Sequence, residues 1–341
     1  MNGRKTINLA LQGGGAHGAL TWGVLDKLLE TQLFTFDGIS GTSAGGMNAI
    51  ILAQGLIDGG DEGARKALHD FWHAVSVSGE QFKMATPLMP VDLLFFHYLQ
   101  APVASVFLRN MTHLFSPYQF NPLNFHPAGE ILNKLIDIEK IKQHSQLKLF
   151  ICATNVQTGK IRIFHNNELS INVLLASACL PKLFQAVKVE NDYYWDGGYL
   201  GNPPIFPLIY DTKSPDIVIL HVVPIARPTI PKTIDEIDMR LREISFNSSL
   251  MREMRAIAFV SGLIENEWIK PEYEEKLKKI NLHCVRADEA MLDFSLESVF
   301  DSNWEFLLKL RDLGRNAAEV WLEKNYDSIG KKTSVDFNEW L

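Results

Sequence analysis

The sequence predicts an α/β fold in three layers, α/β/α, with a mainly parallel central sheet and a helical extension at the carboxyl end. The first sixty residues read as strand, glycine loop, helix, strand, sharp turn and helix. Strands that alternate with helices are typical of a parallel sheet covered on both faces. After Pro228 the composition changes to long, charged, helical patterns, which predict the extension.

Each expected element follows from its own pattern of apolar residues. Residues 6–11 form a short β-type run, while 19–30 and 47–56 have the apolar spacing of helices. The further strands that we expect lie at 147–153, 160–165, 186–195 and 217–223, and the long C-terminal helices lie at 234–261 and 303–324.

The chain is expected to divide into a catalytic domain, residues 1–227, and a helical C-terminal extension, residues 228–341. A length of 341 residues exceeds the usual single domain, but a large α/β domain with an appendage accounts for it without a second core. Residues 81–125 interleave aromatic residues with prolines. They suit either a satellite of the core or an apolar lid or acyl-chain groove.

Composition limits the partners and the compartment. The net charge of −7 is spread along the chain, so no broad attraction to nucleic acid or to an anionic membrane is expected. The three cysteines, Cys152, Cys179 and Cys284, are odd in number and far apart, which suits a reducing compartment. Because neither a signal peptide nor a membrane-spanning stretch is evident, we expect a cytoplasmic protein that contacts membranes only peripherally.

Residues 13–18, Gly-Gly-Gly-Ala-His-Gly, follow a strand and open a helix. Gly13, Gly15 and Gly18 satisfy the pattern G-x-G-x-x-G, which is found in dinucleotide-binding folds. The glycines expose backbone N–H groups at a helix N-terminus, where an anion is stabilised. The anion can be the pyrophosphate of a cofactor, with Asp37 as the acidic partner, or the oxyanion of an ester intermediate.

Residues 41–46, Gly-Thr-Ser-Ala-Gly-Gly, match the nucleophile motif G-x-S-x-G through Gly41, Ser43 and Gly45. A nucleophile on a sharp strand-to-helix turn needs a strained backbone, and flanking glycines remove clashes there. Both loops follow strands of one parallel sheet and so lie at its carboxyl edge, where α/β folds bind ligands. Together they indicate that Ser43 is the nucleophile of a serine hydrolase.

A serine hydroxyl needs a base. The order Ser43, Asp196 and then His221 or His283 fits an α/β-hydrolase triad. That fold requires several strands before the nucleophile, whereas here only one precedes the strand that leads into residues 41–46, the serine elbow. A different dyad is the alternative. Asp196, followed by Gly197 and Gly198, ends a β-type run.

The glycine loop, Gly-Thr-Ser-Ala-Gly-Gly and Asp-Gly-Gly, in this order, resemble the patatin-like phospholipase family, as does Ala-Ser-Ala-Cys-Leu-Pro at 176–181. The resemblance covers about residues 5–225. It implies a patatin-like fold and a lipid acyl hydrolase in which Ser43 is the nucleophile and Asp196 is the base. It also implies an oxyanion hole formed by the backbone N–H groups of residues 13–16, namely Gly13, Gly14, Gly15 and Ala16. His17 departs from the family, because many relatives have arginine there.

Two rival functions remain at this stage, a nucleotide-binding oxidoreductase that uses the glycine loop and a catalytically silent scaffold with the same fold. His69 and His73 have the i, i+4 spacing of zinc ligands, but no third ligand is evident, so neither a metal nor a cofactor is expected. The expected partners are a lipid or acyl-ester substrate and a second copy of the chain, held through the C-terminal helices.

Overall fold

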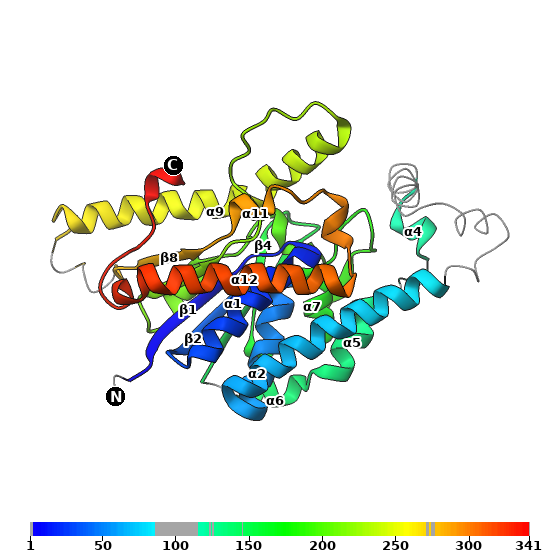
Figure 1. The fold of residues 1–341 in the computed structure, drawn as a ribbon, viewed down its shortest axis with the longest axis horizontal. Helices are drawn as coiled ribbons and strands as arrows, with labels where there is room; N and C mark the ends of the chain where they lie inside the picture. Colours follow the sequence, from blue (N-terminus) through cyan, green and yellow to red (C-terminus); the bar gives the residue numbers. More distant parts are fainter. Residues whose placement is uncertain are drawn as a thin grey trace.

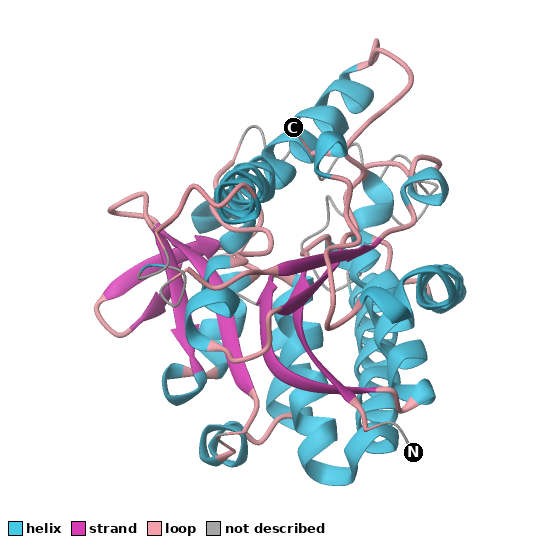
Figure 2. Cartoon of the chain, turned by 90° about the vertical axis from the view of Figure 1, so that its left-hand side faces the viewer, coloured by secondary structure: helices cyan, strands magenta, loops and turns pink. Residues whose placement is uncertain are grey.

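The computed structural model describes residues 3–85, 115–122, 124, 126–144, 146–270, 273 and 277–340. A single sheet of eight strands lies at its centre, with helices on both sides (Figures 1 and 2). The strands are β1 (Lys5–Leu11), β2 (Phe34–Thr42), β3 (Lys148–Asn155), β4 (Ile161–His165), β5 (Val187–Val189), β6 (Asp192–Asp196), β7 (Asp216–Leu220) and β8 (Asn281–Val285).

The strands β3, β2, β1, β7 and β8 lie side by side in this order and run parallel. The remaining pairs, β3 with β4, β3 with β6 and β5 with β6, are antiparallel. The prediction of a mainly parallel central sheet between layers of helices is therefore confirmed.

Helices cover the sheet on both faces. The principal ones are α1 (Gly18–Thr31), α2 (Ala44–Ala85), α5 (Pro127–Leu135), α6 (Ile138–Gln143), α7 (Ile171–Ser177), α8 (Phe206–Asp211), α9 (Ile234–Glu265) and α12 (Trp304–Asn325). Short helical segments include η1 (Gly15–His17), α4 (Pro117–Phe120), η4 (Asn166–Glu168), η5 (Gly197–Tyr199), α11 (Asp288–Met291), η6 (Glu297–Phe300), η7 (Tyr326–Ser328) and η8 (Phe337–Glu339). Helix α2 is interrupted at Gly59 and Gly60, whose backbones are not helical.

The alternation of side chains along the strands divides the core into two clusters. In β7, Val218 and Leu220 pack in the cluster that includes residues of α1, α2 and α12, whereas Ile217 and Ile219 pack in the cluster that includes residues of α8 and α9. Successive strand residues point to opposite faces, so these clusters lie on the two sides of the sheet.

Some expected elements differ from those in the structure. The strand expected at 186–195 is a hairpin of β5 and β6, and strand β8 was not predicted. The residues after 228 thus contribute a strand to the central sheet as well as helices, among them α12, which packs along α1. The division at residue 228 stays a prediction.

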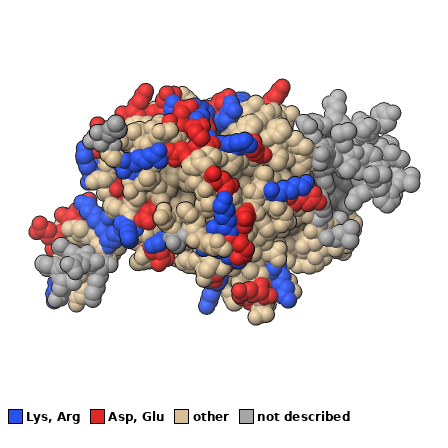
Figure 3. Space-filling view, turned by 90° about the horizontal axis from the view of Figure 1, so that it is seen from below, with Lys and Arg blue, Asp and Glu red and all other residues tan. Residues whose placement is uncertain are grey.

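Most of the segment that we expected to be a lid or groove, residues 81–125, lies outside the described residues. Among the helices that the structure describes, none combines the length and the hydropathy needed to cross a bilayer. On the face shown in Figure 3, acidic and basic side chains are interspersed and no large area carries a single sign.

Candidate active site

Ser43 lies on the sharp turn between β2 and α2. Its φ of 55° is in the left-handed region, which a residue with a side chain rarely adopts. The flanking glycines allow this turn, because a Cβ on Gly45 would lie 2.1 Å from the carbonyl oxygen of Leu11 and one on Gly41 would lie 2.6 Å from that of Gly45. The turn places Ser43 directly before the N-terminus of α2, where developing negative charge is stabilised.

The surroundings of Ser43 come from two distant segments. Its backbone N–H donates a hydrogen bond of 2.9 Å to Oγ of Ser177, at the end of α7. The glycine loop lies against its side chain, because a Cβ on Gly13 would be only 2.8 Å from the Cβ of Ser43. The structure therefore brings the two predicted loops into contact, with Ser43 only 8% exposed.

Asp196 approaches Ser43 because β2 and β6 end on the same side of β3. Strand β4 pairs with both Cys152 and Ala153, so the other side of β3 is taken by Thr42 of β2 at Cys152 and by Asp196 of β6 at Ala153. The two antiparallel strands thus end beside consecutive residues of β3. Ser43 comes directly after β2, and Asp196 is the last residue of β6.

Asp196 is fully buried. Burial raises the pKa of its carboxyl group to about 6, against the lowering effects of the Gly198 N–H, the Ser43 hydroxyl and the charge of Arg242. Oδ1 accepts a 2.7 Å hydrogen bond from the Gly198 N–H. Oδ2 is buried and makes no hydrogen bond of standard geometry. The Ser43 hydroxyl therefore lowers the pKa of Asp196 because it lies close to the carboxyl group. Oδ2 is therefore the oxygen available to take a proton.

The glycine loop offers fewer free donors than expected. The Gly13 N–H already donates a 2.7 Å hydrogen bond to Oδ1 of Asn202. Residues 14–16 lie at the start of η1, where backbone N–H groups have no partner within the helical turn. Gly15 has a φ of 63°, and a Cβ there would lie 2.5 Å from the carbonyl oxygen of Val299, so this position requires glycine.

His17, the departure from the family pattern, is buried in the glycine loop at 3% exposure. Burial and, secondarily, the charge of Arg242 lower its pKa to about 3. Its Nε2 is hydrogen-bonded to Oγ of Ser298 at 2.7 Å, and the rings of Phe294 and Phe306 lie beside it. At neutral pH His17 is therefore uncharged and held in place by the C-terminal part of the chain.

The two histidines of the alternative triad have other partners. Nε2 of His221 is 3.0 Å from Oδ1 of Asn247. Nε2 of His283 is 3.1 Å from Oδ1 of Asp216, and its Nδ1 is 2.9 Å from Oγ of Ser334. Both side chains are fully buried, and neither is hydrogen-bonded to Ser43 or Asp196 within the described residues.

The groups considered for a cofactor or a metal also have structural partners. Oδ2 of Asp37 accepts hydrogen bonds from the N–H groups of Lys213 and Ser214, in the loop before β7. The rings of His69 and His73 pack against Trp304, with their planes perpendicular to its ring. Among the described residues, no three histidine, cysteine or acidic side chains are grouped to hold a metal ion.

Several residues that hold the site were not predicted from the sequence. They belong to segments far from the motifs that they contact, and they are Ser177, Asn202, Asn247 and Ser298. Of these, only Ser177 had a sequence signal, because it lies in the run Ala-Ser-Ala-Cys-Leu-Pro. The others follow no local pattern.

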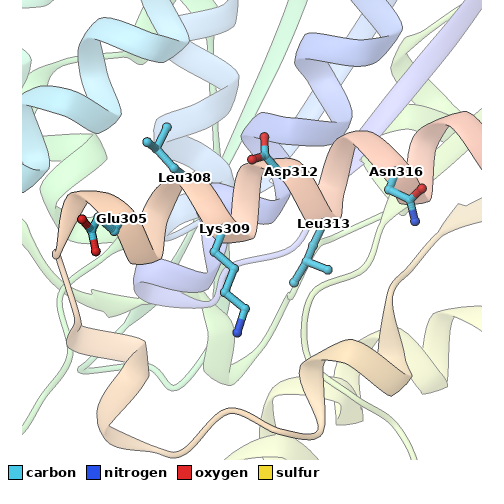
Figure 4. A pocket seen from close by; sticks show the side chains of 6 residues that line it. All are labelled: Glu305, Leu308, Lys309, Asp312, Leu313 and Asn316. Carbon is cyan, nitrogen blue, oxygen red and sulfur yellow. The ribbon is translucent and has the colours of Figure 1, made fainter.

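A shallow hollow on the outer face of α12 is unrelated to this site (Figure 4). It includes no residue of the glycine loop, the elbow or the segment around Asp196. The residues that line it are Glu305, Leu308, Lys309, Asp312, Leu313 and Asn316.

Comparison with known proteins gives a family and several similar solved structures, among them the following two. VipD from Legionella pneumophila has 15% sequence identity and a TM-score of 0.40, with 94% of this chain and 67% of that chain covered. The type III effector protein ExoU has 13% identity and a TM-score of 0.35, with coverage of 94% and 53%, so this chain spans about half of ExoU. No curated protein sequence matches.

The model of the patatin-like phospholipases matches residues 9–209, which is more than half of the 341 residues. The match includes the glycine loop, the serine elbow and the Asp-Gly-Gly segment. This chain belongs to the patatin-like phospholipase family, a family of lipid hydrolases.

Proposed function

We propose that the protein is a serine acyl hydrolase that cleaves acyl esters of lipids, as a phospholipase A, lysophospholipase or esterase does, with Ser43 as nucleophile and Asp196 as base. One observation carries the proposal. The chain turns at Ser43 and at Asp196 beside consecutive residues of β3, and the glycine loop lies against the Ser43 side chain.

In the proposed reaction, Oδ2 of Asp196 takes the proton of the Ser43 hydroxyl while Oγ forms a bond to the ester carbonyl carbon. The negative charge moves to the carbonyl oxygen, which the N–H groups of Gly14, Gly15 and Ala16 stabilise. Because the Gly13 N–H is bound to Asn202, we leave it out of the donor set.

The tetrahedral intermediate then breaks its bond to the alcohol, which leaves with the proton from Asp196. This gives an acyl-enzyme on Ser43. A water molecule gives a proton to Asp196 and attacks the acyl carbon, which forms a second tetrahedral intermediate. This intermediate breaks its bond to Oγ of Ser43, which takes the proton back from Asp196, and the fatty acid is released. The burial that raises the pKa of Asp196 makes it a stronger base than an exposed carboxylate.

The test is hydrolysis of p-nitrophenyl butyrate and of a short-chain lipid ester. We expect Ser43→Ala and Asp196→Asn each to lower kcat/KM by about a thousandfold or more. Asp192→Asn is the matched control, because Asp192 lies on the same strand but is exposed, and it should keep full activity. A fluorophosphonate probe should label the wild type and fail to label Ser43→Ala.

Two outcomes would contradict the proposal. Folded wild-type protein that neither turns over esters nor takes the probe would favour a catalytically silent scaffold. Full activity of Asp196→Asn, together with loss of activity in His221→Ala or His283→Ala, would favour a triad. The oxidoreductase alternative is weakened because Asp37 is bound to the loop before β7.

We also propose a cytoplasmic location with peripheral membrane contact, and self-association through the C-terminal helices. Self-association is supported by an exposed apolar stripe on α9, formed by Ile234, Ile237, Leu241 and Ile244. Their spacing of three and four residues places them on one helical face. Light scattering over a dilution series should show a dimer that Leu241→Glu dissociates, and a monomer at all concentrations would contradict it.

A further inference from the structure

Arg242 of α9 lies beside the proposed active site. Its guanidinium group stacks over the ring of Phe246, 4.9 Å from the ring centre. That ring packs against Gly198, where a Cβ would lie 2.7 Å from Cε1 of Phe246, and the Gly198 N–H binds Asp196. The ring of Phe246 and the residue Gly198 therefore lie between Arg242 and the carboxylate of Asp196. Helix α9 follows residue 209, where the family match ends.

The charge of Arg242 affects the pKa of a group on each side of Ser43. It lowers the pKa of Asp196, the last residue of β6, and also that of His17, which belongs to the glycine loop. These two segments flank the nucleophile, since Asp196 and the glycine loop both lie next to Ser43. Arg242 therefore places a positive charge close enough to the two segments beside Ser43 to affect both of them.

Arg242 has no polar partner among the residues that the structure describes, whereas neighbouring arginines do. Arg227 forms a forked ion pair with Glu243, and Arg240 also binds that carboxylate. Arg242 uses only the face of its guanidinium group, against Phe246. A guanidinium carries five N–H donors and stays protonated in proteins. Leaving it half-buried and unpaired is unfavourable, so its donors are available to an anion.

The glycine loop cannot supply this positive charge. His17 is uncharged at neutral pH because burial lowers its pKa to about 3, and its Nε2 is already hydrogen-bonded to Ser298. Among the described residues, Arg242 is the cation whose charge reaches Asp196. The site thus has a single source of positive charge in its described part, and this source comes from α9.

We propose that Arg242 is the anion-binding residue of this active site and holds the phosphodiester group of a glycerophospholipid while Ser43 attacks a neighbouring acyl ester. The inference rests on the proposed hydrolase function. In a glycerophospholipid, the acyl esters and the phosphodiester are attached to the same glycerol unit, so both can occupy one site. The planar guanidinium matches two phosphate oxygens with parallel hydrogen bonds. A neutral acylglycerol offers no such anion, so Arg242 determines specificity.

The experiment compares two soluble substrates with the same acyl chains, dihexanoylphosphatidylcholine and dihexanoylglycerol. We expect Arg242→Gln to lower kcat/KM for the phospholipid by about ten- to a hundredfold, through KM. The neutral substrate should change by less than about twofold, since it makes no charged contact with Arg242. Arg242→Lys keeps the charge without the planar fork, and it should give an intermediate loss on the phospholipid alone.

Arg252→Gln is the matched control. Arg252 is on the same helix, but it is exposed and hydrogen-bonded to Ser248 one turn away. It should leave both substrates unaffected. An equal loss on both substrates in Arg242→Gln, or no loss on either, would overturn the proposal while leaving the hydrolase function intact. Wild-type protein that hydrolyses neither substrate would instead overturn the hydrolase function, and the inference with it.

A measurement on the wild type covers the case in which Arg242→Gln does not fold. Glycerophosphocholine should compete with dihexanoylglycerol, whereas glycerol at the same concentration should not. If neither competes, the proposal is wrong. If inorganic phosphate competes as well as glycerophosphocholine does, the residue binds free phosphate, and the head-group assignment is overturned.

Discussion

At the scale of single residues, burial of Asp196 makes its carboxylate more basic and the folded protein less stable. A buried carboxyl group without a full set of hydrogen bonds resists ionisation, and this raises the pKa of Asp196 to about 6. The same carboxylate must be ionised to take a proton from Ser43. Asp196 can therefore act as a base only above the pH at which it ionises. Its ionisation also lowers the stability of the folded protein.

We expect kcat/KM for a neutral ester to rise with pH and to level off above about pH 6 to 7. Protonated Asp196 cannot act as a base, so activity should fall about tenfold per pH unit below its pKa of about 6. A pH series with dihexanoylglycerol measures this. A profile that stays flat from pH 8 down to pH 5 would show that Asp196 is not the base.

Asp196→Asn should stabilise the folded protein at neutral pH. The pKa of Asp196 is raised from 3.8 to about 6, so the folded state holds its proton more tightly than the unfolded state does. Stability therefore falls as pH rises from about 4 to 6 and stays lower above that, by about 3 kcal/mol. Asparagine cannot ionise, so we expect the variant to gain about this much at pH 8 and little at pH 4.

Urea unfolding of both proteins at pH 4 and pH 8 measures this difference. Asp192→Asn, on the same strand but exposed, should show no comparable pH-dependent gain. An Asp196→Asn variant that is less stable than the wild type at pH 8 would mean that the ionised carboxylate is stabilised by its surroundings.

The residues of the dyad could be predicted from the sequence because they lie in short glycine-rich motifs. Ser43 needs a strained turn, and only flanking glycines allow it. Asn202 and Ser298 could not be predicted, because each is more than 180 positions from its partner and lies in no local pattern. Arg242 was visible as one of several arginines on a helix, but its proximity to Asp196 depends on how α9 packs.

At the scale of elements, periodicity predicted the strands and helices that are buried on one or both faces. The apolar runs of β1, β3 and β7 and the helical spacing of α1 gave their positions to within a few residues. Strand β8, Asn281–Val285, was missed because it is short and contains His283, whose fully buried side chain is paired with Asp216. A buried polar residue interrupts the apolar pattern on which a strand prediction depends.

The close approach of the glycine loop to the elbow can be tested with one methyl group. In Gly13→Ala, the added Cβ would lie 2.6 Å from the carbonyl oxygen of Thr42 and 2.8 Å from the Cβ of Ser43. The two loops must then move apart. We expect kcat to fall by about a hundredfold, because small displacements of reacting groups have effects of this size, and stability to fall by about 1–3 kcal/mol.

Gly262→Ala is the control for the same substitution. It lies in α9, and nothing is within 4 Å of its added Cβ. Alanine favours a helix over glycine by up to about 1 kcal/mol, so this variant should be slightly more stable and fully active. Normal kcat in Gly13→Ala would argue that the loop does not contact the reacting groups.

At the scale of the whole molecule, the C-terminal part is joined to the catalytic part by close contacts. A Cβ on Gly23 of α1 would lie 1.9 Å from the carbonyl oxygen of Arg311, and one on Gly314 of α12 would lie 2.0 Å from that of Leu20. The two helix backbones therefore touch. Most of the charged residues of the long helices after residue 228 lie on the exposed faces of these helices. Their number is the reason why the composition suggested an appendage.

Helix α9 holds the glycine loop of the proposed active site. Oδ1 of Asn247 accepts a hydrogen bond from the Gln12 side chain directly before the glycine loop. Oγ of Ser249 accepts one from the N–H of Asn202, which in turn binds Gly13. The glycine loop is thus positioned by a helix that lies outside the family match.

A chain that ends at residue 227 should consequently fail to fold as a stable monomer. It would lack β8, which pairs along β7, and α12, which covers α1, so an unpaired strand edge and apolar core residues would be exposed. We expect the fragment 1–227 to aggregate or to unfold without a cooperative transition, as measured by size-exclusion chromatography and thermal unfolding. Co-expression with residues 228–341 should restore a soluble complex with ester hydrolysis. If the fragment alone is monomeric, unfolds cooperatively and hydrolyses esters, the part after 227 is an independent appendage and the contacts of α9 are not needed for the site.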